Sequence, residues 1–190
     1  MSTTARKKLT ELRHSAPKRA RLFENLARHL YAGVYNYLCW MGGDRALAEE
    51  LTQETFVQAW QNIDGLRSES AAQAWLYRIA RNQFLQHARR AQLPTVPLDE
   101  CIDRAAPARA RIQPERAAER ADLCQAVQEA LQSLPEGYRE VIVLHNVEHL
   151  SLAQVARVLE LPVGTVKSRR ARAFNMLRHQ LASEVDHHEM

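Results

Sequence analysis

The residues from Val163 to Gln180 carry the side chains best suited to contact with a polyanion. The stretch contains no acidic residue and five basic ones: Lys167, Arg169, Arg170, Arg172 and Arg178. When it is wound as a helix, four polar residues share one side: Thr165, Ser168, Arg169 and Arg172. Arginine and lysine bind phosphates and guanine edges, and hydroxyls bond to either, so the pattern predicts recognition of duplex DNA.

The residues just before this stretch predict the element that would position it, a helix-turn-helix from Ser151 to Gln180. Ser151 and Gln154 have the spacing of a capping box for a first helix, and Pro162 ends that helix and can open a second. The side opposite the polar one is mostly apolar: Val163, Val166, Ala173, Leu177 and Leu181. Arg170 falls in this apolar arc, so its stem is expected to lie along the packed face or to reach a phosphate. A solvated amphipathic helix with a charged outer face is the alternative.

A second basic group lies on a predicted helix over residues 71–90. Its outer arc holds Arg78, Arg81, Asn82, Leu85 and Arg89, and two aromatic residues, Trp75 and Tyr77, stand near its start. Cations that follow a backbone and rings that stack on bases are what single-stranded nucleic acid requires. A helix whose aromatic residues are core and whose arginines only face solvent fits the pattern equally well.

An acidic face is predicted on a third helix, which Asp44 caps and which reaches about Asn62. Its inward arc holds Leu47, Leu51, Thr55, Ala59 and Ile63. Its outward arc holds Glu50, Gln53, Glu54, Val57 and Gln61. Such a charge pattern is most often a plain solvated face, and the apolar Val57 among acids and amides offers the alternative of a docking face for a basic partner helix.

The composition indicates an all-α protein that is not an enzyme. The 190 residues include only 6 glycines and show no strand-like alternation, while a net charge of +4 and a pI near 9.2 suit a polyanionic partner. The cysteines at positions 39, 101 and 124 lack CxxC spacing, so neither a zinc site nor a disulfide framework is expected. We therefore expect the protein to lie in a reducing cytoplasm. His145 and His149 are four residues apart, as two metal ligands on a helix can be, but the sequence shows no third ligand for a metal site. No membrane span, signal peptide, cofactor motif or nucleophile–base pair is found.

The predicted organisation is two small helical domains joined by a flexible linker. A basic N-terminal arm (1–18) precedes the first domain (19–91), whose first helix is expected to run from Arg19 to the Gly42–Gly43 stop. A Pro-, Ala- and Arg-rich linker (92–116) would let the domains bind separated sites on one DNA. The second domain (117–183) contains the helix-turn-helix, and a short tail follows (184–190).

Three ordered motifs resemble bacterial RNA polymerase sigma factors of the extracytoplasmic-function type. They read AEELTQETFVQAW (48–60), AWLYRIARN (74–82) and LPEGYREVIVLHNVEHLSLAQVARVLELPVGTVKSRRARA (134–173). The resemblance implies a factor that binds core polymerase through the β′ clamp helices and β flap, recognises −35 and −10 promoter elements, promotes melting and serves a stress- or signal-responsive regulon. It also implies control by an anti-sigma factor.

The resemblance assigns roles residue by residue. Core polymerase would meet Glu50, Leu51, Gln53, Glu54 and Val57. The −10 element would meet Leu66, Arg67, Ser68, Trp75, Tyr77, Arg78, Arg81 and Asn82. The −35 element would meet Ser151, Thr165, Lys167, Ser168, Arg169 and Arg172. Arg170 and Ala171 depart from the family pattern, which leaves the −35 sequence open. An autonomous dimeric helix-turn-helix regulator remains the alternative function, and a helical nuclease is a more distant one.

Overall fold

The computed structural model describes the backbone of residues 3–66, 68–91 and 126–188, and the side chains of 17–66, 68, 70–91 and 126–180. Every regular element among these residues is a helix, and none of them forms a strand, as the composition predicted. The elements are α1 (Thr3–Gly42), α2 (Arg45–Asn62), a 3₁₀ turn η1 (Ile63–Gly65), α3 (Glu69–Ala91), a helical segment at residues 126–133, α5 (Glu136–Ile142), a π-helical turn η2 (Val143–Val147), α6 (Leu152–Leu159) and α7 (Val163–His188).

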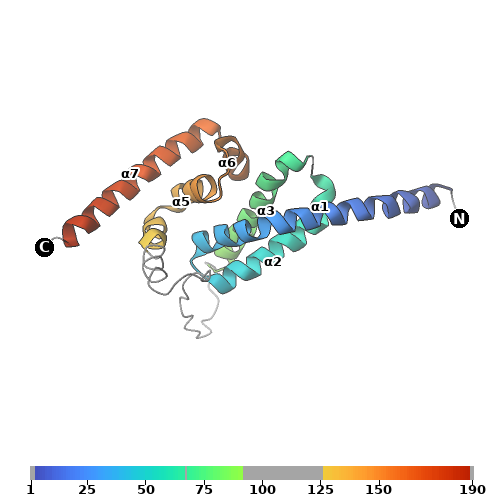
Figure 1. Ribbon diagram of the computed structural model, residues 1–190, viewed down its shortest axis with the longest axis horizontal. Helices are drawn as coiled ribbons and strands as arrows, with labels where there is room; N and C mark the ends of the chain where they lie inside the picture. Colours follow the sequence, from blue (N-terminus) through green and yellow to red (C-terminus); the bar gives the residue numbers. More distant parts are fainter. Residues whose placement is uncertain (1–2, 67, 92–125, 189–190) are drawn as a thin grey trace, which may run out of the picture.

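The first bundle consists of α1, α2 and α3, packed side by side (Figure 1). The predicted inward arc of α2 is confirmed, because Leu51, Thr55, Ala59 and Ile63 are buried. The Thr55 hydroxyl donates to the Leu51 carbonyl at 2.7 Å, which satisfies a polar group inside the core. The Asp44 cap is also confirmed, since its carboxylate accepts from the amides of Ala46 and Leu47.

The start of α1 differs from the predicted loose arm over residues 1–18. The helix begins at Thr3, includes Pro17 and extends beyond the ends of α2 and α3 (Figure 1). The arm is rich in alanine, arginine, lysine and leucine, which favour helix, and extending an existing helix requires no new nucleus. The predicted end is confirmed, because Gly43 adopts φ +75° and its amide donates to the Cys39 carbonyl at 2.8 Å.

The second bundle consists of residues 126–133, α5, η2, α6 and α7. The predicted helix-turn-helix is confirmed within it: Ser151 forms the capping box with Gln154, and the residue after α6, Glu160, adopts the left-handed conformation (φ 55°). Val166 and Ala173 of α7 are fully buried. Val163 is exposed rather than packed, because the first residue of a helix has no preceding turn to lie against.

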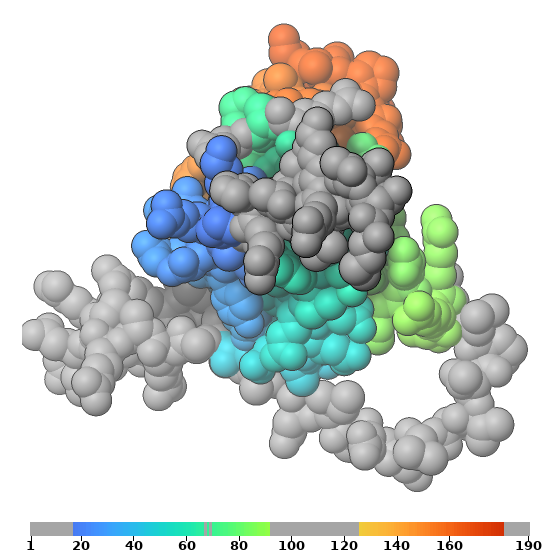
Figure 2. All heavy atoms as spheres, turned by 90° about the vertical axis from the view of Figure 1, so that its right-hand side faces the viewer, coloured from blue at the N-terminus to red at the C-terminus, as the bar shows by residue number. Residues whose placement is uncertain are grey.

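The two bundles pack against one another and share one core. Helix α6 lies on α3, and α5 and η2 reach α1 (Figure 1). In Figure 2, orange atoms of the second bundle lie directly against blue and green atoms of the first. Arg139 of α5 shows how closely they meet, since its guanidinium donates to carbonyls of its own bundle and, at 3.0 Å, to the Met41 carbonyl of α1. The predicted linker (92–116) lies outside the described residues. The sequence predicts that the linker lets the two domains bind separated sites. In this conformation, the two domains are in contact with each other.

Candidate nucleic-acid and partner interfaces

The outward face of α2 is exposed as predicted, with one exception. Glu50, Gln53, Glu54 and Val57 all face solvent, and Val57 is 58% exposed although it is apolar. Leu51 is only 3% exposed and packs in the first bundle's core. The predicted surface contact at Leu51 is therefore wrong in this conformation. Leu51 follows Glu50 by about 100° around the helix, which turns it toward α1 and α3.

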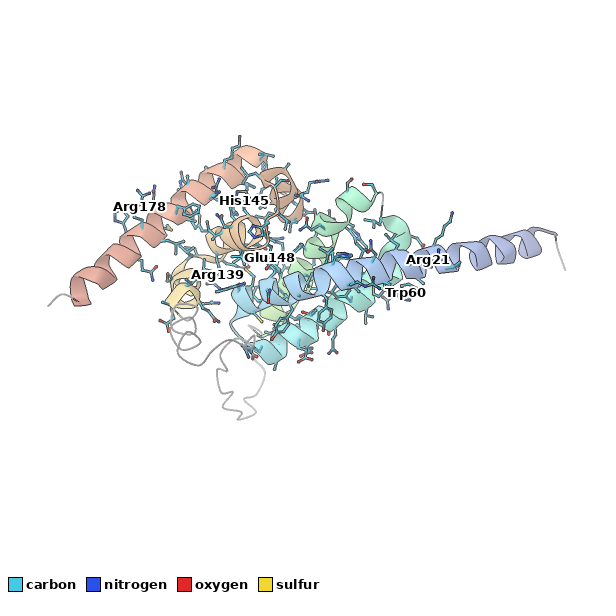
Figure 3. The ribbon with its side chains drawn as sticks, in the orientation of Figure 1. Arg21, Trp60, Arg139, His145, Glu148 and Arg178 are labelled. Carbon is cyan, nitrogen blue, oxygen red and sulfur yellow. The ribbon has the colours of Figure 1, made fainter. Side chains whose placement is uncertain are left out.

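An apolar groove that sequence reading missed adjoins this face. It measures about 720 Å³ and is lined by Ala20, Phe23, Tyr31, Gln53, Phe56, Val57, Trp60 and Gln61. Trp60 lies on α2 and is labelled in Figure 3. Its ring lies edge-on to Phe23 at 5.1 Å, and the Arg19 guanidinium lies over it at 5.2 Å. The only sign of this groove in the sequence is that the apolar residues Val57 and Trp60 are three positions apart and so lie on one side of the helix. The apolar groove and its acidic rim together are suited to binding an amphipathic helix that has basic residues along one side.

A second pocket brings together three of the predicted −10 residues. Trp75, Arg78 and Asn82 of α3 line it, with Ile79, and the opposite wall comes from α2 and η1: Gln58, Gln61, Asn62, Asp64 and Gly65. Its volume of about 580 Å³ falls in the range of small-ligand sites. Asn82 is exposed and Trp75 half-buried. An amide edge beside an indole ring can bond to and stack with a planar base.

The loop before α3 supplies less than predicted. Leu66 is half-buried, and its amide donates to the Ile63 carbonyl at 3.1 Å. Ser68 is exposed and bonds to the Ser70 hydroxyl at 3.0 Å, while Arg67 lies outside the described residues. Ser70 and Gln73 have the spacing of a capping box, but α3 already begins at Glu69, so Ser70 lies inside the helix and is not its N-cap. The Gln73 side chain instead accepts from Gln154 of α6 at 3.1 Å.

Tyr77 is placed differently from Trp75 and does not reach the pocket. It is 1% exposed, lies edge-on to Tyr37 at 5.6 Å, and donates to Glu148 Oε2 at 2.7 Å. Burial, reinforced by the Glu148 carboxylate, raises the pKa of the Tyr77 hydroxyl. The prediction that Tyr77 contacts DNA is therefore wrong in this conformation, and the alternative of a core aromatic residue holds for it.

Two of the arginines on the outer arc of α3 contact acids of the second bundle. Arg81 Nε donates to Glu140 Oε1 at 2.8 Å, and Arg78 Nη1 lies 3.2 Å from Glu160 Oε1. Glu140 is only 3% exposed and also accepts from the Tyr37 hydroxyl at 2.9 Å. Burial raises the pKa of the Glu140 carboxyl, and the charge of Arg81 and these two hydrogen bonds oppose that rise. Sequence reading missed these acids, since Glu140 lies 59 residues from Arg81.

The polar side of α7 divides into free and packed residues. Lys167, Ser168 and Arg172 are exposed, and Thr165 is half-buried. Arg169 is also half-buried and lies against α5, where its Nη1 is 3.0 Å from the position of a Cβ added to Gly137. Arg170 is half-buried, and its guanidinium lies over the Phe174 ring at 5.5 Å. Its Nε is buried and has no hydrogen-bond partner among the described residues. Ser151 acts as the cap of α6.

Two family models match the chain, and between them they cover both bundles. The model described as Sigma-70 region 2 matches residues 22–93, and that described as Sigma-70, region 4 matches residues 124–177. The ECF RNA polymerase sigma factor SigW of Bacillus subtilis is 34% identical over 160 residues, which are 80% of this chain and 85% of SigW. This chain belongs to the extracytoplasmic-function (ECF) sigma factors.

Solved structures confirm the fold of this sigma factor. The sigma factor RpoE from Bartonella quintana, solved in complex with the anti-sigma factor NepR, is 25% identical with a TM-score of 0.66, over 84% of this chain and 96% of that chain. CnrH, solved in complex with the cytosolic domain of CnrY, is 26% identical with a TM-score of 0.63, over 86% of this chain and 90% of that chain.

One of the histidines singled out from the sequence, His145, contacts the backbone of the second bundle. His145 Nδ1 lies 2.7 Å from the Leu150 carbonyl oxygen and so supports the turn before α6 (Figure 3). Within the described ranges, no three His, Cys, Asp or Glu side chains gather as metal ligands would. No described helix of the sigma factor combines the length and apolarity needed to cross a bilayer.

Proposed function

We propose that this sigma factor is an alternative initiation factor that binds core RNA polymerase and directs it to promoters. The β′ clamp helices meet the α2 face of Glu50, Gln53, Glu54 and Val57, and the β flap meets the second bundle. Helix α7 reads the −35 element as duplex, and the pocket at Asn82 takes an unpaired base of the −10 element. The polymerase synthesises RNA from the genes of a signal-responsive regulon. An anti-sigma factor controls the access of this sigma factor to core polymerase.

The observation that carries this proposal is the presence of three chemically different surfaces on one chain. The α2 face is acidic and borders an apolar groove, the α3 pocket combines an indole with amides, and the free side of α7 is basic. A regulator that binds duplex DNA alone needs only the third surface. The sigma factors of known structure support the proposal, because RpoE is solved with an anti-sigma factor.

Purified core polymerase supplies the direct test of the proposed function. Transcription of a genomic fragment library by core enzyme is expected to start at discrete sites only when this chain is added, because the chain alone provides promoter recognition. Run-off products mapped at their 5′ ends measure this. Tight operator binding by a dimer without polymerase, together with no chain-dependent start sites, would favour the autonomous regulator instead.

Replacing Arg172 by alanine is expected to relax recognition of the −35 element. Arg172 is exposed on the free side of α7, and a lost arginine contact to a base costs about 1–3 kcal/mol of discrimination at that base pair. A randomised promoter library transcribed by each variant measures the change. Arg178→Ala, an exposed arginine farther along α7, is the matched control. A uniform loss over all sequences would identify Arg172 as a phosphate contact.

A further inference from the structure

The first half of α1 is strongly basic, and none of the surfaces proposed above uses its charges. Residues 1–21 contain seven basic residues and a single acid, Glu11. The helix runs past the ends of α2 and α3, and Figure 3 labels Arg21 on it. Lys18 and Arg21 are one turn apart and exposed, and neither forms an ion pair with any side chain that the structure describes. Two cations are therefore free to bind an anion here.

A groove along this side of α1 presents polar groups rather than apolar ones. It measures about 580 Å³ and is lined by Lys18, Arg21, Leu22, Glu24, Asn25 and Arg28. Its one acid, Glu24, is paired with Arg28 at 2.8 Å, and its one apolar residue, Leu22, is half-buried. A partner helix needs apolar anchors, whereas lysine, arginine and asparagine side chains are those that bind phosphate oxygens. The groove is therefore better suited to a nucleic-acid backbone than to a protein.

The basic side of α1 is fixed to the rim of the pocket proposed for the −10 base. Arg19 Nη1 lies 3.0 Å from Asp64 Oδ2, and Arg19 Nη2 donates to a carbonyl at the end of α2 at 3.2 Å. Asp64 lines the pocket together with Trp75, and Leu22 packs in one apolar cluster with that tryptophan. Arg19 neutralises the carboxylate at the rim, and Lys18 precedes it in the chain. The free cations of α1 thus lie next to the end of the pocket that η1 forms.

We propose that Lys18 and Arg21 bind phosphates of the DNA strand whose base enters the pocket at Asn82. This inference rests on the proposed function for the role of the pocket. A strand that leaves the pocket past η1 meets α1, where the two cations hold its backbone whatever its sequence. The helix continues from Pro17 back to Thr3, which at 1.5 Å per residue adds roughly 22 Å of basic helix beyond Lys18. The arm supplies affinity, and the pocket supplies the choice of base.

The full chain with Lys18→Gln and Arg21→Gln, assembled with core polymerase, tests this contact. Its binding to a promoter premelted over the −10 region is measured by fluorescence anisotropy at several salt concentrations. Each phosphate contact to a single strand contributes about 0.7 to the slope of log affinity against log salt. We therefore expect the slope to fall by about 1.4 and the affinity near 0.1 M salt to fall about 25-fold. Lys18→Arg with Arg21→Lys keeps both charges at the same positions, and this matched control is expected to keep the natural slope.

A second probe, a duplex that ends upstream of the −10 region, separates the captured strand from duplex DNA. The double glutamine variant is expected to bind this probe like the natural chain. An unchanged slope on the premelted promoter, or the same change of slope on both probes, would overturn the assignment. Weaker binding of the variant to core enzyme would overturn it too and make the arm a polymerase contact. Failure of the proposed function is distinguishable, because the natural chain itself would then give core polymerase no affinity for the premelted promoter.

Discussion

Reversing Glu54 to lysine is expected to weaken binding of this sigma factor to core RNA polymerase by roughly ten- to a hundredfold. The change replaces an attraction to a basic helix by a like-charge contact at the centre of the interface, and each tenfold corresponds to about 1.4 kcal/mol. Glu54 is exposed, so the fold is expected to remain intact. Competition against labelled sigma factor for a limiting amount of core enzyme measures the affinity, and circular dichroism checks the fold.

A neighbouring reversal provides the control for Glu54. Glu49→Lys makes the same charge change on the same helix, and Glu49 is exposed but lies outside the arc of Glu50, Gln53 and Glu54. If both reversals weaken binding equally, the effect is one of overall charge and α2 has no defined docking face. If Glu54→Lys binds core enzyme like the natural chain, the assignment of the face is wrong.

Asn82→Ala is expected to reduce promoter opening at the −10 element by roughly tenfold while leaving core binding and −35 recognition nearly unchanged. Asn82 offers the one exposed amide that α3 contributes to the pocket with Trp75. Loss of its hydrogen bonds to a captured base costs about 1–3 kcal/mol. Because unpairing costs least where a base is already free, the defect should shrink on a template mismatched over the −10 region.

Permanganate reactivity of unpaired thymines on matched and premelted promoters measures this defect. Gln86→Ala is the matched control, since Gln86 is an exposed amide on α3 that does not line the pocket. Equal reactivity of Asn82→Ala and the natural chain on the matched promoter would refute the role of Asn82. An equal deficit on both templates would instead indicate weaker docking on polymerase.

The ion pairs between the two bundles complicate tests of α3 by mutation. Arg78 and Arg81 each have a partner in the second bundle as well as a proposed DNA contact. Replacing either arginine removes both contacts, so a change in DNA binding does not report on the DNA contact alone. Among the residues that the structure describes, Asn82 forms no hydrogen bond with the second bundle, and it lines the pocket, which makes it the cleaner probe of base capture.

The sequence by itself determined the helices, their caps and the sides they present. The capping box of Ser151 and Gln154, the Asp44 cap and the buried arc of α2 depend on residues within a few positions of each other, so local geometry sets them. Two predictions from the sequence were wrong. The arm at residues 1–18 was predicted to be loose, but its helix-forming composition extends α1 to Thr3. Leu51 was assigned both to the buried arc and to the polymerase face, and it is buried.

Only the tertiary structure decided which of the outward residues are free. Tyr77, Arg78 and Arg81 lie on one helix with Trp75 and Asn82, yet packing of the second bundle covers Tyr77 and pairs both arginines while the pocket stays open. The Tyr37 and Glu140 side chains that meet at 2.9 Å are 103 residues apart in the chain. Periodicity reports the direction of a side chain from its own helix and carries no information on what arrives from so far along the chain.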